Sequence, residues 1–313
     1  MQLLISGSNG LVGQALIGPL GGQGHRIVRL VRARPSPSGD EVLWDPEAGT
    51  IDAEGLEGVE AVVHLAGEPI ASGRWTERRK AAIRDSRIDG SRLLARALMR
   101  LRRPPRVVLS ASAVGYYGDA ADAVLTESSP SGTGFLADVC RAWEAAWLPA
   151  TEKGIPVAHL RFGVILSPAG GMLKRLLPIF RLGLGGRLGS GDQYMSWIAL
   201  PDVVGVIQYL LADVRLSGAF NMVSPEPVTN RAFTQALART LHRPAIFPVP
   251  AGAVRFAFGE MADALLLSSS RVVPQRLLES SYAFRYPHLD DALRDLLSGV
   301  SPKQMEKTHA PVA

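Results

Sequence analysis

The 313-residue sequence contains a single cysteine, Cys140, and only five lysines. One thiol cannot form a disulfide within the chain, and it gives no cysteine cluster for a metal. We therefore expect no metal site, and a reducing cytoplasm is the simplest compartment for the protein. Long apolar runs are also missing, since no segment approaches the roughly 18 uninterrupted apolar residues that a membrane span needs.

The first 24 residues contain no charged side chain, which is a feature of some signal peptides. This segment nevertheless holds seven glycines and has no basic residues ahead of its apolar part. Both features argue against a secretion signal and against a membrane anchor.

Basic residues are in excess, with a net charge of +5 and a pI of about 9.6. They concentrate between Arg74 and Arg106, where the pattern fits either a helix that binds nucleic acid or an amphipathic helix with a solvated basic face. The second interpretation is favoured, because arginine is abundant throughout the chain. It places one set of side chains inward: Ile83, Leu93, Leu94, Ala97 and Leu98.

Three glycines spaced three residues apart follow the first apolar segment, Gln2 to Ile5. They are Gly7, Gly10 and Gly13, and after a helix-like run a second strand is predicted over Arg26 to Val31. In this strand, loop, helix and strand order, the glycines allow a tight turn, close approach of the backbone to a pyrophosphate, and close packing of the helix. The segment therefore predicts a nucleotide-binding site in which helix N–H groups hold an anion.

Predicted strands and helices continue to alternate through the first half of the chain. The strands are expected over 42–44, within 59–67, over 106–112 and over 156–162, and the helices over 76–101 and 135–147. This alternation predicts an α/β fold with a doubly wound parallel sheet, in which functional groups gather at the carboxyl ends of the strands.

The regular alternation of predicted strands and helices ends after Gly163. Helices are expected over 172–181, 201–213, 274–278 and 290–297, a loop over 182–191, and a strand returning to the sheet over 218–223. We predict a Rossmann domain over 1–165, completed by 198–223. A smaller α+β cap domain would comprise 166–197 and 224–298, followed by a flexible tail over 299–313.

Four segments with recognisable motifs follow one another along the chain: the glycine loop, His64 to Ile70, Ser110 to Gly118, and Phe220 to Pro225. Together they resemble the extended short-chain dehydrogenase/reductase superfamily. More narrowly, the sequence is similar to an uncharacterised branch related to NAD-dependent epimerases and dehydratases that ends in a C-terminal module of unknown function. The resemblance covers Met1 to about Leu297, and it implies a nicotinamide dinucleotide lying across the strand ends.

The resemblance implies a set of cofactor-binding residues, which runs from the glycine loop to the fourth predicted strand end. Trp44 and Asp45 lie where the adenine is usually held, and the segment ending in Gly67 borders the ribose. The full set is Gly7, Asn9, Gly10, Leu11, Val12, Gly13, Arg32, Arg34, Trp44, Asp45, Leu65, Ala66, Gly67, Arg87, Ser110, Ala111, Arg161 and Gly163.

Arg32, with Arg34 behind it, stands at the end of the second strand, where relatives that use NAD carry an acidic residue for the ribose hydroxyls. A guanidinium suits a 2′-phosphate. The sequence therefore favours NADP(H) over NAD(H), although Arg32 could simply be a solvated residue after a strand.

The catalytic pattern departs from the superfamily, whose enzymes use a Tyr-x3-Lys pair. Ser112 matches the usual serine, but Leu136 and Cys140 stand at about the positions of the tyrosine and lysine, and no lysine in the chain has a tyrosine four residues before it. In one hypothesis, Tyr116 or Tyr117 replaces the missing acid, with Arg87 or Arg161 as the cation.

Two other hypotheses stay open. The protein could bind NADP(H) without turnover, as a sensor or regulatory protein, or the basic helix could bind nucleic acid. For an enzyme, we expect a reduction or epimerisation of a small molecule similar to a nucleotide sugar. The substrate-side residues would be Met172, Gln193, Tyr194 and Trp197, with ordinary cap packing as the alternative. Family analogy also suggests a homodimer.

Overall fold

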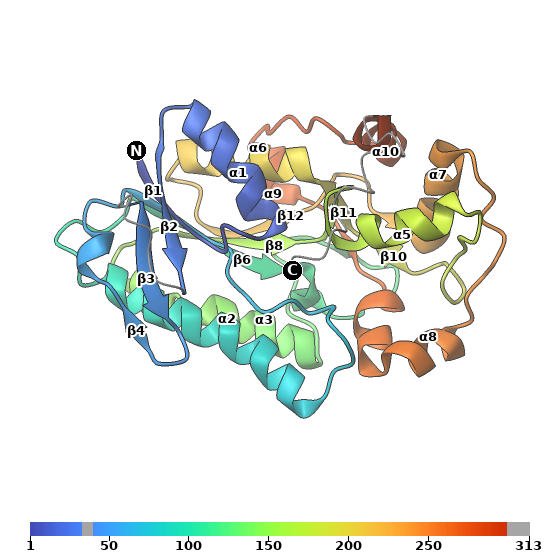
Figure 1. The fold of residues 1–313 in the computed structure, drawn as a ribbon, viewed down its shortest axis with the longest axis horizontal. Coiled ribbons are helices and arrows are strands. Elements are labelled where there is room, and N and C mark those ends of the chain that lie inside the picture. Colours follow the sequence, from blue (N-terminus) through green and yellow to red (C-terminus); the bar gives the residue numbers. More distant parts are fainter. Residues whose placement is uncertain (33–39, 299–313) are drawn as a thin grey trace, which may run out of the picture.

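The computed structural model describes residues 1–32 and 40–298. Arg34 and the predicted tail over 299–313 lie outside the described residues. An eight-stranded sheet in the order β12-β8-β6-β5-β1-β2-β3-β4 forms the centre of the molecule (Figure 1). Its strands are β1 (Gln2–Ser6), β2 (Arg26–Val31), β3 (Glu41–Asp45), β4 (Thr50–Ile51), β5 (Ala61–His64), β6 (Val107–Ala113), β8 (Val157–Phe162) and β12 (Gly218–Met222). Neighbouring strands pair in parallel, except that β3 and β4 are antiparallel.

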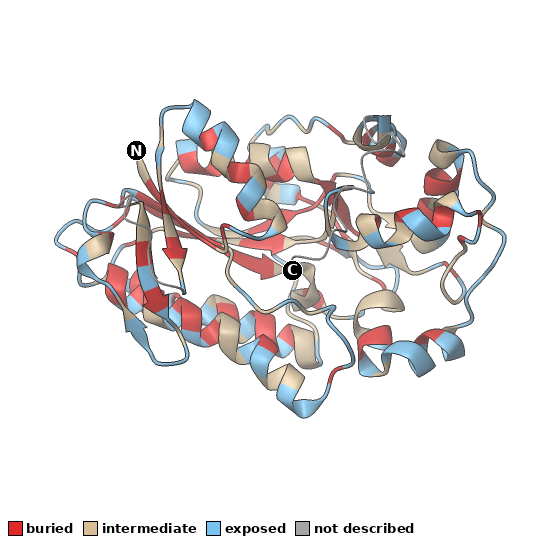
Figure 2. Ribbon diagram, viewed as in Figure 1, coloured by how far each residue is buried: buried red, intermediate tan, exposed pale blue. Residues whose placement is uncertain are grey.

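The central strands form because their apolar side chains are buried on both faces of the sheet. In β1, Leu3, Leu4 and Ile5 are fully buried, and all four residues of β5 are buried. Such continuous apolar runs are typical of parallel strands covered by helices on both sides. Figure 2 shows the burial, with buried residues along the strands and exposed residues on the outer faces of the helices.

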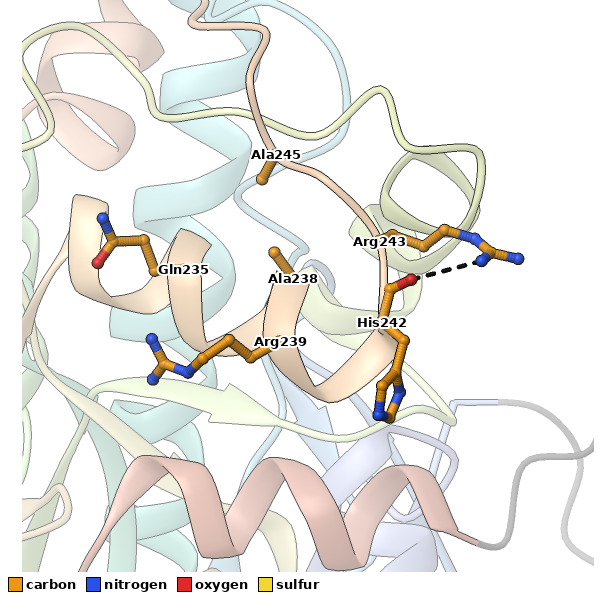
Figure 3. Close-up of a pocket in the computed structure, with 6 residues that line it drawn as sticks. All are labelled: Gln235, Ala238, Arg239, His242, Arg243 and Ala245. Carbon is orange, nitrogen blue, oxygen red and sulfur yellow. Dashed lines mark hydrogen bonds between the residues drawn. The ribbon is translucent and has the colours of Figure 1, made fainter.

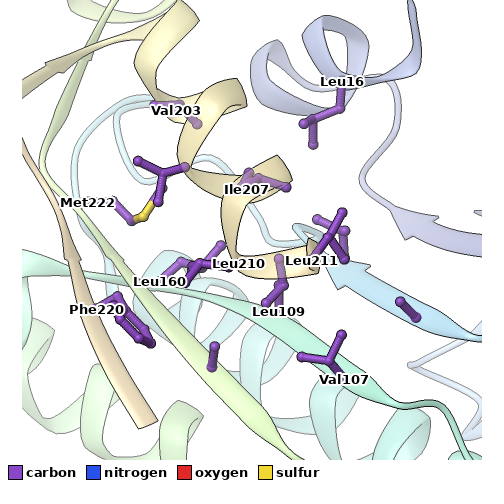
Figure 4. Close-up of a cluster of buried hydrophobic side chains, with 14 of the residues drawn as sticks. Leu16, Val107, Leu109, Leu160, Val203, Ile207, Leu210, Leu211, Phe220 and Met222 are labelled. Carbon is purple, nitrogen blue, oxygen red and sulfur yellow. The ribbon is translucent and has the colours of Figure 1, made fainter. Parts of the chain in front are cut away.

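The helices form one layer on each face of the sheet. One layer contains α1 (Leu11–Gly22), α6 (Leu200–Ala212) and α9 (Gln275–Glu279), and the other contains α2 (Glu77–Leu98), α3 (Phe135–Ala145) and α4 (Leu148–Glu152). In the first layer, side chains of α6 pack with Leu16 of α1 against Leu109, Leu160 and Phe220 of the sheet (Figure 4). This arrangement confirms the predicted doubly wound sheet, and the return of β12 to β8 confirms the predicted returning strand.

The basic segment forms the long helix α2, which begins after Thr76, whose hydroxyl accepts a hydrogen bond from the Arg79 N–H. Ile83, Leu94, Ala97 and Leu98 are buried and Leu93 is half-buried, which confirms the predicted inward face. On the outer face, acidic neighbours pair with several of the cations, as Asp85 does with Arg84. Binding of nucleic acid by this face stays a hypothesis.

The C-terminal part of the chain is mainly helical and packs beside the carboxyl ends of the strands (Figure 1). It contains α5 (Gly171–Arg181), α7 (Asn230–Leu241), α8 (Ala251–Phe258), a π-helical turn (Ala262–Leu266) and α10 (Leu289–Ser298). Short paired strands hold its loops: β10 (Tyr194–Met195) with β13 (Val228–Thr229), β9 (Val164–Leu166) with β11 (Trp197–Ala199), and β7 (Val124–Leu125) with β14 (Arg271–Val272). None of the helices within 1–32 and 40–298 is both long and apolar enough to cross a membrane.

The carboxylate of Asp202, near the start of α6, connects the sheet layers to the C-terminal segment. Its side chain is 1% exposed. Its two oxygens accept hydrogen bonds from the backbone N–H groups of Arg285, at 2.7 Å, and Tyr286, at 2.9 Å.

Replacement of Asp202 by alanine should leave the buried Tyr286 N–H and the partly buried Arg285 N–H without these acceptors. At roughly 1–3 kcal/mol for each group, we expect the free energy of unfolding to fall by about 2–4 kcal/mol, measured by urea denaturation. The exposed Asp122→Ala variant is the control and should stay within about 0.5 kcal/mol of the original protein. Equal stability of the two variants would contradict the connecting role of Asp202.

Candidate active site

A cavity of about 810 Å³ opens at the carboxyl ends of the strands. It extends from the glycine loop after β1, past the end of β6 and the inner face of α3, to the loops of the cap. The neighbouring strands β1 and β5 connect to helices in opposite layers, so the cavity lies at the point where the strand order reverses. Ligands of open α/β sheets bind at such switch points.

Ser6 holds the ends of β1 and β5 together at the cavity floor. Its hydroxyl oxygen lies 2.8 Å from His64 Nδ1 and accepts hydrogen bonds from the N–H groups of Leu65, at 3.0 Å, and Ala66, at 3.2 Å. Gly7 follows with a φ of +67°, and a Cβ atom there would lie 2.8 Å from the Leu65 carbonyl carbon. Only glycine therefore allows the two loops to approach this closely.

The N-terminus of α1 faces the same cavity, which Gly10, Leu11, Val12 and Gly13 line. A Cβ atom on Gly13 would lie 2.4 Å from the Gly7 carbonyl oxygen, so the helix starts in direct contact with the loop. In the described part of the chain, no side chain accepts a hydrogen bond from the first turn of α1. The bare N–H groups and the helix dipole suit an anion, and the residues present fit the diphosphate of a dinucleotide.

His64 lies fully buried between Trp44 and Trp147, with edge-to-face ring contacts at 5.9 and 5.7 Å. Burial lowers the pKa of His64 to about 4, so the ring is neutral near pH 7. Trp44 is itself only 3% exposed and packs against the helix α2 residue Gly90. The prediction that the Trp44 ring faces the adenine is therefore wrong. The neighbouring Asp45 is exposed, and its Oδ1 accepts hydrogen bonds from the N–H groups of Glu47 and Ala48 in a turn, so its contact with adenine stays a prediction.

Ser112, at the end of β6, lines the cavity and donates a hydrogen bond of 2.7 Å to Oε1 of Glu144 on α3. Glu144 also forms a paired contact with Arg161 of β8, with N–O distances of 2.8 Å at both carboxylate oxygens. Burial alone would raise the pKa of the Glu144 carboxyl, but the hydrogen bonds and charge of Arg161 outweigh it and lower the pKa. Glu144 is thus a carboxylate aimed at the serine hydroxyl.

Tyr117 is 2% exposed, and its hydroxyl lies between two partners. It accepts a hydrogen bond from Arg161 at 2.9 Å and donates one to Asn221 Oδ1 at 2.7 Å. Burial raises the pKa of Tyr117 to about 12 despite the adjacent guanidinium. The ring of Tyr116 lies under the Arg161 guanidinium, at 3.5 Å.

These contacts correct two predictions. Neither Tyr116 nor Tyr117 is among the residues that line the cavity, so neither is placed to act as the missing acid. Arg161, predicted as a cofactor ligand, is 4% exposed and bonded to Glu144 and Tyr117 behind the cavity wall. Sequence alone could not identify these partners, because Glu144 and Ser112 are 32 positions apart.

Leu136 and Cys140 of α3 both line the cavity, at about the positions where relatives carry the tyrosine and lysine. Burial raises the pKa of the Cys140 thiol to about 12, which makes it a small neutral residue and not a nucleophile. Arg87 of α2 supplies a positive charge on this wall: its guanidinium lies 5.1 Å from the Trp143 ring, and Nη1 donates to the carbonyl oxygens of Glu68, at 3.0 Å, and Ile83, at 2.9 Å.

On the cap side, Met172, Gln193 and Tyr194 line the cavity, and their contact with substrate stays a prediction. Trp197 does not. Its side chain is fully buried in the cap core, and its indole N–H donates to the Glu226 carbonyl oxygen at 2.9 Å. The prediction that Trp197 contacts substrate is therefore wrong, and the alternative of cap packing holds for it.

Comparisons with known proteins agree with this geometry. The sequence profile of the NAD dependent epimerase/dehydratase family matches residues 3–224. The chain belongs to the NAD-dependent epimerase/dehydratase family. A domain of unknown function, DUF1731, matches residues 249–296, which confirms the predicted C-terminal module of this branch.

Several relatives align with nearly the whole of this chain. Epimerase family protein Mb2239 of Mycobacterium bovis is 45% identical over 92% of this chain and 95% of its own. The crystal structure of human epimerase family protein SDR39U1 (isoform 2) with NADPH has a TM-score of 0.88 and 33% identity, covering 96% of this chain and all of that one. A nucleoside-diphosphate sugar epimerase of Corynebacterium glutamicum has a TM-score of 0.80 and 36% identity, covering 98% of this chain and 60% of that one.

The remaining residues that the family resemblance implies for the cofactor fall into two groups. Leu65, Arg87, Ala111 and Gly163 line the cavity with the glycine loop. The others are not among its lining residues. Asn9 and Arg32 are exposed, and Ser110 is fully buried beside the cavity. Ala66 follows Leu65 in the chain, and Gly67 packs against the Arg87 side chain.

A second hollow of about 430 Å³ lies on the outer surface of α7 (Figure 3). Its two arginines are engaged, Arg239 with Asp290 at 3.0 Å and Arg243 with the Arg181 carbonyl oxygen at 2.9 Å. With this lining and its distance from the strand ends, the hollow gives no basis for a catalytic site.

The buried His64 makes the stability of the strand ends depend on pH. The unfolded state takes up a proton near pH 6.5, whereas the folded state does so only near pH 4. Stability should therefore be complete above pH 6.5 and fall by about 1.4 kcal/mol per pH unit as the pH drops through this window.

Replacing His64 by glutamine removes this titration, so the pH dependence between 6.5 and 4 should flatten, as measured by urea denaturation at several pH values. The pKa of the half-buried His159 is also lowered, so His159→Gln is the matched control and should retain the His64 contribution. An identical slope in the original protein and in His64→Gln would contradict the neutral state of His64.

Proposed function

We propose that this chain binds NADPH across the carboxyl ends of its strands and acts as an oxidoreductase or epimerase on a small substrate. One observation supports it most: the bare N-terminus of α1 opens into a cavity that continues to Ser112. The human relative with bound NADPH, which shares both the fold and a third of the sequence, supports the same cofactor.

The preference for the phosphorylated cofactor rests on Arg32. It stands directly after β2 and is exposed, so its guanidinium is available to a 2′-phosphate. Other neighbours in the fold, such as the NAD complex of the Thermus thermophilus UDP-glucose 4-epimerase, share only 18% identity. They support the fold and not the choice of cofactor.

The nicotinamide, when bound, supplies hydride transfer, and the chain supplies the proton route. Because the Ser112 hydroxyl donates to Glu144, its oxygen is left to accept a hydrogen bond from a substrate hydroxyl. In the oxidising direction, a proton can pass from the substrate hydroxyl to Ser112 Oγ while the serine proton moves to Glu144; in a reduction, the same two transfers run in reverse and the proton from Glu144 reaches the substrate oxygen through Ser112. This route replaces the missing tyrosine with a serine and carboxylate pair.

The positive charge that relatives obtain from lysine would come from Arg87. It lines the cavity and is positioned by two backbone carbonyl oxygens and by the face of Trp143. A guanidinium stays protonated at every ordinary pH, so it can stabilise negative charge but cannot serve as the proton donor. This division leaves proton transfer to Ser112 and Glu144.

A second function has its own support, namely NADPH binding without turnover, as a sensor or regulatory protein. Leu136 and Cys140 occupy the wall where the usual catalytic pair would lie, and neither can transfer a proton. A site that retains the cofactor loop and lacks this pair is what a binding protein would have.

The cofactor preference is tested by titrating the protein with NADPH and NADH while following ligand fluorescence. We expect NADPH to bind at least about tenfold more tightly, since a charge-assisted contact to phosphate is worth roughly 1.5–3 kcal/mol. Arg32→Ala should abolish that difference and leave NADH affinity unchanged, and Arg26→Ala, at the start of the same strand, is the control. Equal binding of both cofactors by the original protein would refute the preference.

Turnover is tested by following nicotinamide absorbance with a panel of small ketones, aldehydes and secondary alcohols. Ser112→Ala and Glu144→Gln should each lower kcat by about 100-fold or more, the usual contribution of a positioned proton-transfer group, with NADPH affinity retained. Turnover that survives in Ser112→Ala would exclude the serine route. NADPH binding without turnover of any compound would favour the sensor function.

A further inference from the structure

We infer that the cap side of the cavity takes a small, uncharged and largely apolar molecule with one carbonyl or hydroxyl group, and not a nucleotide sugar. This inference rests on the proposed function, because the polar group would face Ser112 and the cofactor would fill the other half of the cavity. It concerns the walls that the cap and α3 contribute, which differ in character from the glycine-lined half.

Apolar side chains from separate segments converge on this half of the cavity. They come from the loop after β5, the start of α3, α5, β10 and the π-helical turn: Ile70, Phe135, Leu136, Met172, Met195 and Leu265. All six are partly buried. They therefore present carbon surface to the cavity, which a ligand covers with a gain of about 25 cal/mol per Å² of apolar area.

Three serine hydroxyl groups on the cap side donate hydrogen bonds to the protein's own backbone. Ser196 donates to the Ser270 carbonyl oxygen at 2.7 Å, Ser270 to Gly118 at 3.0 Å, and Ser268 to Ala264 at 3.1 Å. These serines hold the cap loops in place. Their hydroxyl protons are not available to a sugar.

The two amide side chains on this side have similar tasks. Gln193 Nε2 donates to the carbonyl oxygens of Leu188, at 3.1 Å, and Leu266, at 3.2 Å, and Asn230 Oδ1 accepts from the Leu188 N–H at 2.8 Å. A polyol or a base requires several convergent donors and acceptors. Among these groups, the Gln193 amide hydrogens and the Asn230 amide oxygen already bind the protein's own loops.

The charges of the lining are unfavourable for a second diphosphate. Among the described lining residues, Arg87 is the only lysine or arginine, and it lies beside the cofactor half. The acids on the cap side are Asp119, Glu260 and Asp263. Glu260 pairs with Lys80 at 3.1 Å and Asp263 with Arg255 at 2.9 Å, so two of these acids are neutralised and the wall offers no net positive charge.

Two arginines near this wall are also engaged. Arg271 lies over the Tyr194 ring at 4.9 Å, and Arg231 pairs with Asp192 at 2.7 Å. Recognition of a diphosphate normally uses arginine or lysine side chains or a helix N-terminus aimed at the ligand. The N-terminus of α1 is assigned to the cofactor, and α3, whose first residues also line the cavity, carries the acidic Asp138 in its first turn.

The inference is tested by isothermal titration calorimetry on the protein saturated with NADP⁺, which cannot reduce a ketone. The probes are acetophenone, cyclohexanone and UDP-glucose. We expect saturable binding of at least one ketone and none of UDP-glucose at the same concentrations. UDP-glucose binding as tight as that of either ketone, or no saturable binding of either ketone, would overturn the inference.

Variants connect the result to the apolar wall. Leu265→Asn should weaken ketone binding by about tenfold, the loss expected when an apolar contact is replaced by an amide, with NADP⁺ affinity changed less than about twofold. Met172→Gln gives a second readout on another element. Leu182→Asn is the matched control, because Leu182 is 74% exposed on the cap surface. Unchanged ketone affinity in both wall variants would also overturn the inference, whereas failure of the original protein to bind NADP⁺ would instead refute the proposed function.

Discussion

The close contact between the loops that follow β1 and β5 is the constraint on which the rest of the site depends. The Ser6 hydroxyl joins the two strand ends through Leu65, Ala66 and His64, and Gly7 has no Cβ because the Leu65 backbone fills that space. With the loops fixed, α1 must start against Gly7, and its first residues line the cavity without a side-chain cap in the described part of the chain. The candidate anion site thus follows from backbone packing and, among the described residues, contains no charged side chain of its own.

A buried ion pair organises the other side of the site. Arg161 of β8 and Glu144 of α3 are held together by two hydrogen bonds of 2.8 Å. Arg161 also donates a hydrogen bond to the Tyr117 hydroxyl, and Glu144 accepts one from Ser112 of β6. Removing two charges from water is expensive, so such a pair is weak support for stability alone. Its geometric consequence is clearer: it fixes the carboxylate against the serine and withdraws Tyr117 from the cavity, which decides which hydroxyl can take part in chemistry.

The parts of the molecule that local pattern specifies were predictable from sequence. Continuous apolar runs predicted the buried strands, and the spacing of Gly7, Gly10 and Gly13 predicted the turn into α1. Contacts between distant segments were not predictable: Trp44 and Trp197 were expected to face ligands, but both are buried because the chain packs other elements over them. Helix α7 was missed, although the Thr229 cap and the spacing of Phe233, Ala236 and Leu237 are its signal. The Ser112 and Glu144 pair had no local signal at all.

The positive charge and the apolar surface of one cavity wall come from two different helices. Arg87 of α2 is the only lysine or arginine among the described lining residues, and α3 presents Leu136 and Cys140 to the same cavity. The Cys140 thiol is close enough to Arg87 for that charge to oppose the rise of its pKa, but burial and the nearby Glu144 carboxylate prevail. The thiol is therefore neutral, and α3 adds apolar surface while α2 adds the charge. Because the two helices are neighbours in the same layer, the wall combines a fixed cation with surface that an apolar group can cover.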